Sequence, residues 1–158
     1  MNATPIVLPE TSLDRYIGGM AALNLPTGDG TGDWHQEQTF FQPRRRLSRS
    51  FISGAGCSTD TTTLLGHEGI VDCTQLVDAL CIAHQGNRVF AATHARAVAD
   101  LVLGALQRGE SPDFVDLDDY MPRPEHKREV FKLLDLAAPK LDDDIRQQLL
   151  AWQIKHPA

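Results

Sequence analysis

The sequence has little of what marks a secreted or membrane-bound protein. Its 158 residues include only 3 cysteines, and Cys57, Cys73 and Cys81 form an odd, widely spaced set that is unlike a disulfide scaffold. No apolar run approaches the roughly 20 residues of a membrane span. Residues 1–10 have neither the basic start nor the apolar core of a secretory signal. We therefore expect reduced thiols and a cytoplasmic protein with no membrane partner.

Positive charge is also scarce. The chain has 15 Lys and Arg against 21 Asp and Glu, which gives a formal net charge of −6. A protein that binds nucleic acid mainly by electrostatics needs the opposite sign, so nucleic acid is not the favoured partner. Apolar residues make up 42% of the chain, enough for one ordinary core and too many for a disordered chain.

The spacing of apolar residues predicts a helix-rich single domain over 1–158 of the α+β class, with a small antiparallel sheet from the N-terminal half. Residues 1–10 read as an extended arm, 11–72 as a mixed region of loops and short strands, and 73–156 as helical. An all-helical domain with long loops is the alternative.

Local start and stop signals place the helices. Thr93 precedes an apolar helix that Gly109 ends, and Pro124 suits the first position of another. Thr11 or Ser12 is the expected cap of an N-terminal helix. The predicted helices cover 11–23, 74–84, 94–106, 124–138 and 141–152, and the predicted short strands include Trp34, Phe40–Phe41, Leu47, Phe51–Ile52, Leu64–Leu65 and Ile70–Val71.

The segment 28–35 is the most unusual of the chain. Gly28, Gly30 and Gly32 stand at every second position, which lets the backbone take positive φ and approach a ligand closely. Asp33 and His35 can place a carboxylate and an imidazole on one side of an extended segment. The structural alternative is a tight loop with the Trp34 side chain anchored in the core.

An enzymatic hypothesis uses Asp33 and His35 together with His94 and Arg96, gathered at one pocket that processes RNA or nucleotides. Arg88 and His94 also fit the loose R-x(4–6)-H pattern of the helical ribonucleases called HEPN domains. Chance alone predicts about one such match in a chain of this composition, so this enzyme would be HEPN-like at most. The structural alternative for Arg96 is a solvated side chain on a capped helix.

Two further clusters are candidate binding surfaces. An acidic connection between helices interleaves carboxylates with aromatic rings, a composition that favours recognition of a basic partner, although a solvated loop would look the same. A second cluster, of basic residues, could instead bind the phosphate groups of DNA, which would make the chain a DNA-binding regulator. The acidic cluster is Asp113, Phe114, Asp116, Asp118, Asp119 and Tyr120, and the basic cluster is Arg44, Arg45, Arg46 and Arg49.

Metal and cofactor signals are weak. His67, Glu68 and Asp72 are of ligand types, but they lack the spacing of a zinc site, so we expect neither a metal nor a cofactor.

The segments 25–35 and 90–97 are similar to segments of small bacterial proteins from toxin–antitoxin or phage-defence gene pairs. This resemblance assigns no catalytic residue. It suggests this setting only, in which the acidic charge of the chain favours a non-enzymatic interaction module. The module would be the antitoxin or neutralising component of such a pair, and its partner a basic toxin encoded by a neighbouring gene. The enzyme and the DNA-binding regulator are the alternatives, and self-association is compatible with each of them.

Overall fold

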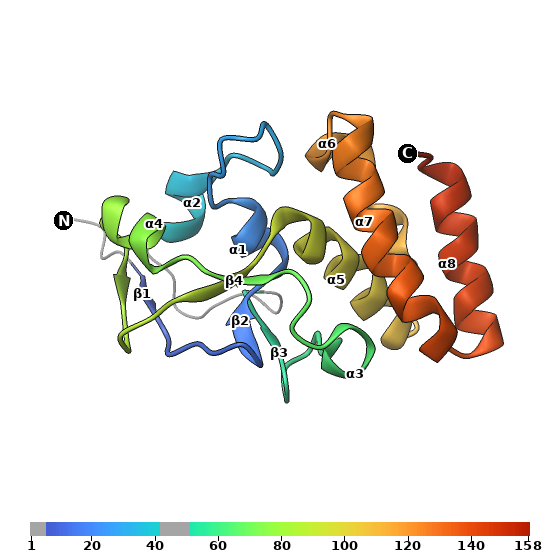
Figure 1. The fold of residues 1–158 in the computed structure, drawn as a ribbon, viewed down its shortest axis with the longest axis horizontal. Coiled ribbons are helices and arrows are strands. Elements are labelled where there is room, and N and C mark those ends of the chain that lie inside the picture. Colours follow the sequence, from blue (N-terminus) through green and yellow to red (C-terminus); the bar gives the residue numbers. More distant parts are fainter. Residues whose placement is uncertain (1–5, 42–50) are drawn as a thin grey trace.

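A computed structural model of the chain describes residues 6–41 and 51–158. It confirms the α+β class: small sheets and short helices form one end of the molecule, and three longer helices form the other (Figure 1). The strands are β1 (Val7–Leu8), β2 (Arg15–Ile17), β3 (Ile52–Gly54), β4 (Ile70–Asp72), β5 (Ala83–His84) and β6 (Phe90–Ala92). The helices are α1 (Gly19–Leu23), α2 (Gln36–Phe40), α3 (Thr62–Leu65), α4 (Thr74–Ala79), α5 (His94–Gln107), α6 (Leu117–Tyr120), α7 (Pro124–Ala137) and α8 (Asp143–Lys155), with 3-10 turns at Pro112–Phe114 and Ala138–Lys140.

The larger sheet has four strands in the order β3-β2-β6-β4. Strand β2 pairs antiparallel with β3 and parallel with β6, and β4 pairs antiparallel with β6. The sheet is therefore mixed, and it takes in β6 from beyond the N-terminal half. The arm predicted over residues 1–10 is held in place where it is described, because β1 pairs in parallel with β5 and Leu8 is buried.

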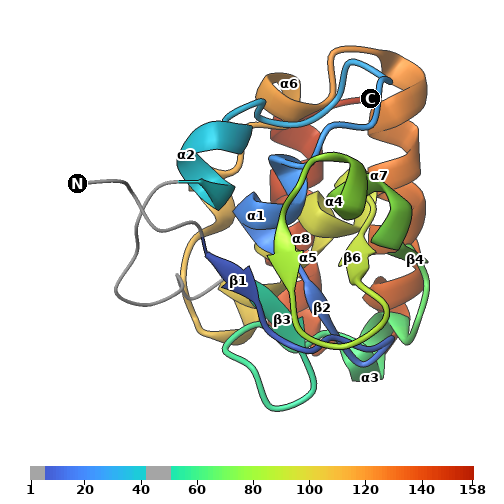
Figure 2. The same ribbon diagram turned by 90° about the vertical axis from the view of Figure 1, so that its left-hand side faces the viewer.

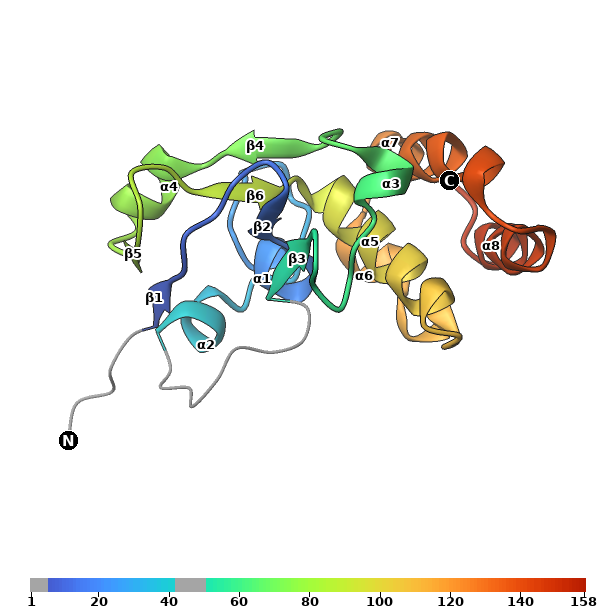
Figure 3. The same cartoon turned by 90° about the horizontal axis from the view of Figure 1, so that it is seen from below.

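Helix α5 forms the centre of the core. Its residues from His94 to Leu106 are all buried, and it leads from the sheet toward α7 and α8 (Figure 3). The predicted start is confirmed, because the Thr93 side chain accepts a hydrogen bond from the backbone N–H of Arg96. The predicted end is confirmed as well, since Gly109 has a φ of 73° and follows the last turn.

The C-terminal helices follow their sequence signals. Pro124 occupies the first turn of α7, whose buried face includes Val130 and Leu134. Helix α8 buries Leu149 and Trp152, and the Trp152 indole N–H donates to the carbonyl of Val115 at 3.1 Å. This bond attaches the last helix to the connection between α5 and α6.

The predicted helix over 11–23 is wrong. Residues Arg15–Ile17 form the strand β2, and the helix is confined to Gly19–Leu23. The reason is tertiary: the Tyr16 and Ile17 side chains are both fully buried within the sheet, whereas Leu13 is 38% exposed. Gly18 separates the two elements, and a Cβ there would lie 2.2 Å from the Ser53 hydroxyl oxygen.

Three other predictions of local structure need correction. The strand expected around Phe40 is the helix α2, and the one at Leu64–Leu65 is the helix α3. The helix expected over 74–84 stops at Ala79, because Cys81 turns the chain with a φ of 60° and His84 joins the strand β5. The strands at Ile70–Val71 and Ile52 are confirmed, and Leu47 lies outside the described residues.

Candidate functional site

The loop of residues 25–35, here called the glycine loop, connects α1 to α2 and passes next to α6 (Figure 1, Figure 2). Three hydrogen bonds fix its second half. The Asp33 N–H donates to the Leu23 carbonyl at 2.9 Å, and the His35 N–H donates to the Asn24 side-chain oxygen at 2.7 Å. The Gly32 N–H donates to the Tyr120 carbonyl at 2.9 Å. The loop is therefore held by groups on both sides, which limits its conformational freedom.

His94, the first residue of α5, is hydrogen-bonded to the same loop. The ring is 4% exposed, and Nε2 lies 2.7 Å from the carbonyl of Leu25, which can only accept. Burial lowers the pKa of His94, so the ring is neutral at pH 7 and its Nδ1 accepts the hydroxyl proton of Thr31 at 2.6 Å. Both ring nitrogens are thus used to position the loop.

The glycines have the predicted backbone conformation. Gly28, Gly30 and Gly32 have φ values of 81°, 83° and 100°. Only the last is enclosed: a Cβ on Gly32 would lie 2.4 Å from the Leu23 carbonyl oxygen and 2.7 Å from a carbon of the His94 ring. Gly32 is therefore required for the loop to close on α5, whereas Gly28 and Gly30 face open space.

Trp34 is displayed at the surface. The prediction that its side chain is anchored in the core is wrong, because the residue is 72% exposed. Its φ of 64° lies in the left-handed region, which costs a bulky residue about 1–2 kcal/mol. The indole N–H donates to the Thr31 carbonyl at 2.8 Å, so the edge of the ring is fixed while most of its surface meets solvent.

A cavity of about 400 Å³ lies beside Trp34. Its walls come from one stretch of chain, the end of α1, the glycine loop and the first residue of α2, so its shape depends on the hydrogen bonds that fix the loop. The lining residues are Leu23, Asn24, Leu25, Pro26, Thr27, Gly28, Gly30, Thr31, Trp34 and Gln36.

The glycine loop and the acidic connection between α5 and α7 meet at Tyr120. Burial raises the pKa of Tyr120, and the negative charges of Asp33, Asp119 and Asp116 raise it further. Carboxylates from two segments more than 80 residues apart in the sequence therefore act on one phenol. No sequence signal indicated this contact. We call the surface formed by the glycine loop and residues 110–120 the acidic face.

Much of the predicted acidic cluster has internal partners. Lys155 lies 3.3 Å from Asp113, and His156 lies 3.8 Å from Asp116. A hydrogen bond from Lys127 holds the pKa of Asp118 below its ordinary range. Asp119 has no ion pair with another described residue. The Phe114 side chain is 60% exposed, so an apolar ring does stand among these carboxylates.

The four residues of the enzymatic hypothesis are not brought together. Asp33 and His35 pair with each other at 2.8 Å near the surface. His94 is buried beneath the loop, and it lines a second cavity of about 220 Å³ to which the other three do not contribute. Arg88, the partner of His94 in the HEPN-like pattern, is an exposed side chain 3.8 Å from Asp72.

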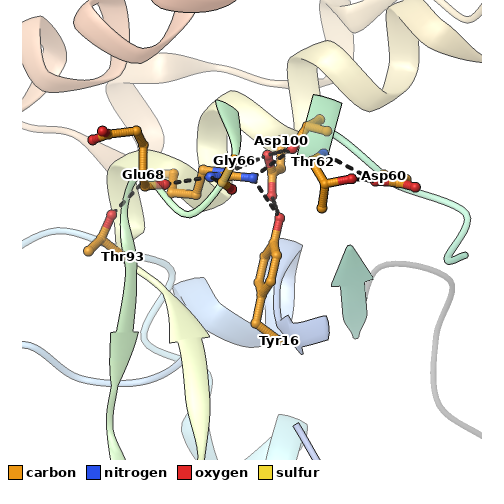
Figure 4. A network of polar contacts seen from close by, with 9 residues as sticks. Tyr16, Asp60, Thr62, Gly66, Glu68, Thr93 and Asp100 are labelled. Carbon is orange, nitrogen blue, oxygen red and sulfur yellow. Dashed lines mark hydrogen bonds and ion pairs between the residues drawn. The ribbon is translucent and has the colours of Figure 1, made fainter. Parts of the chain in front are cut away.

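Arg96 is part of a buried network instead. Figure 4 labels its partners Tyr16, Gly66, Glu68 and Asp100. The prediction of a solvated side chain is wrong, because the residue is 0% exposed. Its Nε donates to Asp100 at 2.9 Å, and its other donors reach the hydroxyls of Tyr16 and Thr61 and two backbone carbonyls. All of the guanidinium nitrogens are occupied by protein groups, so none is left for a substrate.

Asp100 sits at the centre of that network. Tyr16 donates its hydroxyl proton to one carboxylate oxygen at 2.5 Å and Thr61 donates to the other at 2.6 Å. Burial, followed by the negative charge of Asp100, raises the pKa of Tyr16 and keeps its hydroxyl protonated. Burial also raises the pKa of Asp100, against the opposing effect of the Arg96 cation and the hydroxyl donors. The network joins the strand β2 to the helix α5, so its role is to hold the fold together.

The remaining candidates do not form a site among the residues described. Arg44, Arg45, Arg46 and Arg49 lie outside that part of the chain. His67 bonds to Asp14 at 2.7 Å, and no group of three or more His, Cys, Asp or Glu side chains that could hold a metal is found within 6–41 and 51–158. Within the same ranges, no helix combines the length and apolarity needed to cross a membrane.

Comparison with known proteins returned no matching family model, no matching curated protein and no matching solved structure.

Proposed function

We propose that this protein is a non-catalytic interaction module that binds a basic protein partner through the acidic face, with Trp34 as the main anchor. The observation that supports the proposal most strongly is the solvent exposure of the Trp34 side chain. A large aromatic side chain is 72% exposed, its backbone is in the left-handed region, and its loop is fixed by hydrogen bonds to three neighbouring elements.

Rigid, exposed tryptophan is the residue expected at the energetic centre of a protein interface. Because the loop is already held in one conformation, binding does not require it to become ordered, which would weaken the affinity. The backbone strain at Trp34 also points to a role outside folding, since strained residues persist where surrounding structure and function require them.

The charge of the acidic face determines the kind of partner. The glycine loop carries Asp29 and Asp33, and residues 110–120 carry five further carboxylates, without a Lys or Arg in either segment. Ion pairs from α7 and α8 offset part of this charge, but the chain as a whole has a net charge of −6. A basic partner is attracted over long range, and its association rate then falls as salt is added.

The resemblance of residues 25–35 and 90–97 to proteins of toxin–antitoxin and phage-defence pairs suggests the setting. In that setting the module is a bacterial cytoplasmic antitoxin, and its partner is a toxin encoded by a neighbouring gene. The acidic character of the module supports this, because a toxin that acts on RNA or nucleotides needs positive charge at its active surface.

The test is affinity capture from the native host with matched variants. Wild-type chain should retain one stoichiometric partner of basic isoelectric point, and Trp34→Ala should lose most of it. Ile154→Ala is the matched control. Ile154 lies on α8 and is 71% exposed, so this substitution removes a similarly exposed apolar side chain at another place on the surface. Equal capture by Trp34→Ala and the wild type would contradict the proposal, as would an acidic partner.

A further inference from the structure

We propose that the cavity beside Trp34 receives an arginine side chain of the partner, whose guanidinium stacks on the indole ring. This inference rests on the proposed function, because it specifies how the acidic face recognises a basic protein. It draws on three independent features of the glycine loop: the shape of the cavity, the chemistry of its lining and the charge around it.

The shape suits a single long side chain with its flanking backbone. A volume of about 400 Å³ is within the range of specific ligand pockets. Leu23, Leu25 and Pro26 supply apolar walls, against which the methylene stem of an arginine can pack. Since Leu25 is bonded to His94 and Asp33 to Leu23, these walls are preformed.

The glycine loop supplies backbone acceptors beside the cavity. Gly28 and Gly30 line it, and their carbonyls accept no hydrogen bond from another described residue. Asp29 lies between them in the chain but lines the neighbouring cavity of about 220 Å³, so it acts on a cation in this cavity through its charge alone. Its carboxylate forms no ion pair with a described residue. A guanidinium presents five N–H donors in a planar fork, so it can use several such acceptors at once.

The indole of Trp34 supplies the platform. Its N–H is already donated to Thr31, so the ring edge is satisfied and the ring face is the part left to bind. Tryptophan attracts cations over its face more strongly than the other aromatic side chains, and the flat guanidinium stacks better than an ammonium. An arginine is therefore preferred to a lysine and to any neutral side chain of the same shape.

The experiment follows the two indole N–H signals of the ¹⁵N-labelled full chain by NMR, because the sequence has only two tryptophans. The probes are the N-acetyl methylamides of arginine, lysine and citrulline, the last being a neutral analogue of arginine. Arginine should shift the Trp34 signal in a saturable way, about two- to fivefold more tightly than citrulline, and lysine should fall between. The Trp152 signal reports on the folded core, because that ring is 1% exposed.

Variants separate the contributions. Asp29→Asn should weaken the binding of arginine and leave that of citrulline unchanged. Trp34→Phe lacks the reporter signal, so it is followed by the backbone amide signals of the glycine loop, and it should retain weaker binding of arginine. Citrulline binding as tightly as arginine, or an unmoved Trp34 signal, would overturn the arginine pocket. That failure is distinct from failure of the proposed function: capture of a partner that depends on Trp34 could still hold, and the anchor would then meet an apolar surface.

Discussion

The backbone N–H of Gly32 donates to the carbonyl of Tyr120 at 2.9 Å. This single bond joins the glycine loop to the helix α6, two segments that are separated by most of the chain. It places Asp33 near the phenol of Tyr120, where Asp116 and Asp119 also act. The acidic face therefore exists because Gly32 can approach α5 and α6 more closely than any other residue could.

Substitution of Gly32 should move the glycine loop away from α5 and α6. We expect Gly32→Ala to reduce the free energy of unfolding by about 2–4 kcal/mol, because the added Cβ meets both a backbone oxygen and the His94 ring at positive φ. Gly30→Ala is the matched control: it has a similar φ and open space, so only the backbone cost of about 1 kcal/mol applies. Denaturant unfolding measures both, and equal losses would contradict the close approach at Gly32.

His94 should make the stability of the protein sensitive to mild acid. Burial lowers its pKa in the folded chain below the ordinary value of 6.5. Below pH 6.5 the unfolded chain binds a proton that the folded chain resists, so the stability that His94 contributes is present above that pH and falls as the pH drops. The stability difference between the wild type and His94→Gln should therefore shrink between pH 7 and pH 5 in urea unfolding. A difference that is constant or grows would contradict the assignment of a buried, neutral ring.

The network around Asp100 should be costly to break. Asp100→Ala leaves the buried Arg96 cation without its carboxylate, and we expect a loss of about 3–5 kcal/mol. Tyr16→Phe removes one donor to that carboxylate and should cost about 1–3 kcal/mol. Asp135→Asn, on the exposed side of α7, is the control and should stay within about 0.5 kcal/mol.

The same variants also test whether the network is structural. If Asp100→Ala were as stable as the wild type, the buried pair would not support the fold. A catalytic role for Arg96 would then have to be considered again.

The sequence predicted best where local signals decide the structure. Thr93 and Gly109 mark the ends of α5 because capping and positive φ are properties of single residues. Arg96 and Asp100 stand four residues apart, a spacing that allows them to pair along a helix, but the spacing does not indicate their burial. That burial depends on Tyr16 and Thr61, which come from distant parts of the chain.

Tertiary pairing explains the main errors. The apolar spacing of residues 13–23 fits a helix, yet Tyr16 and Ile17 gain more by lying between β3 and β6 than a helix with two adjacent glycines could offer. In the glycine loop the positive φ values were predictable from composition. The outward position of Trp34 was not, because it results from bonds of the loop to α5 and α6.

The most direct test of the account is to replace Trp34 with glycine and to measure stability and partner capture on the same preparation. The account predicts that Trp34→Gly unfolds at the same or slightly higher denaturant concentration, because relief of about 1–2 kcal/mol of backbone strain offsets the lost hydrogen bond to Thr31. Capture of the partner should be lost. A variant that is clearly less stable but still captures the partner would show that Trp34 serves the fold, and would contradict its assignment as the anchor of an interface.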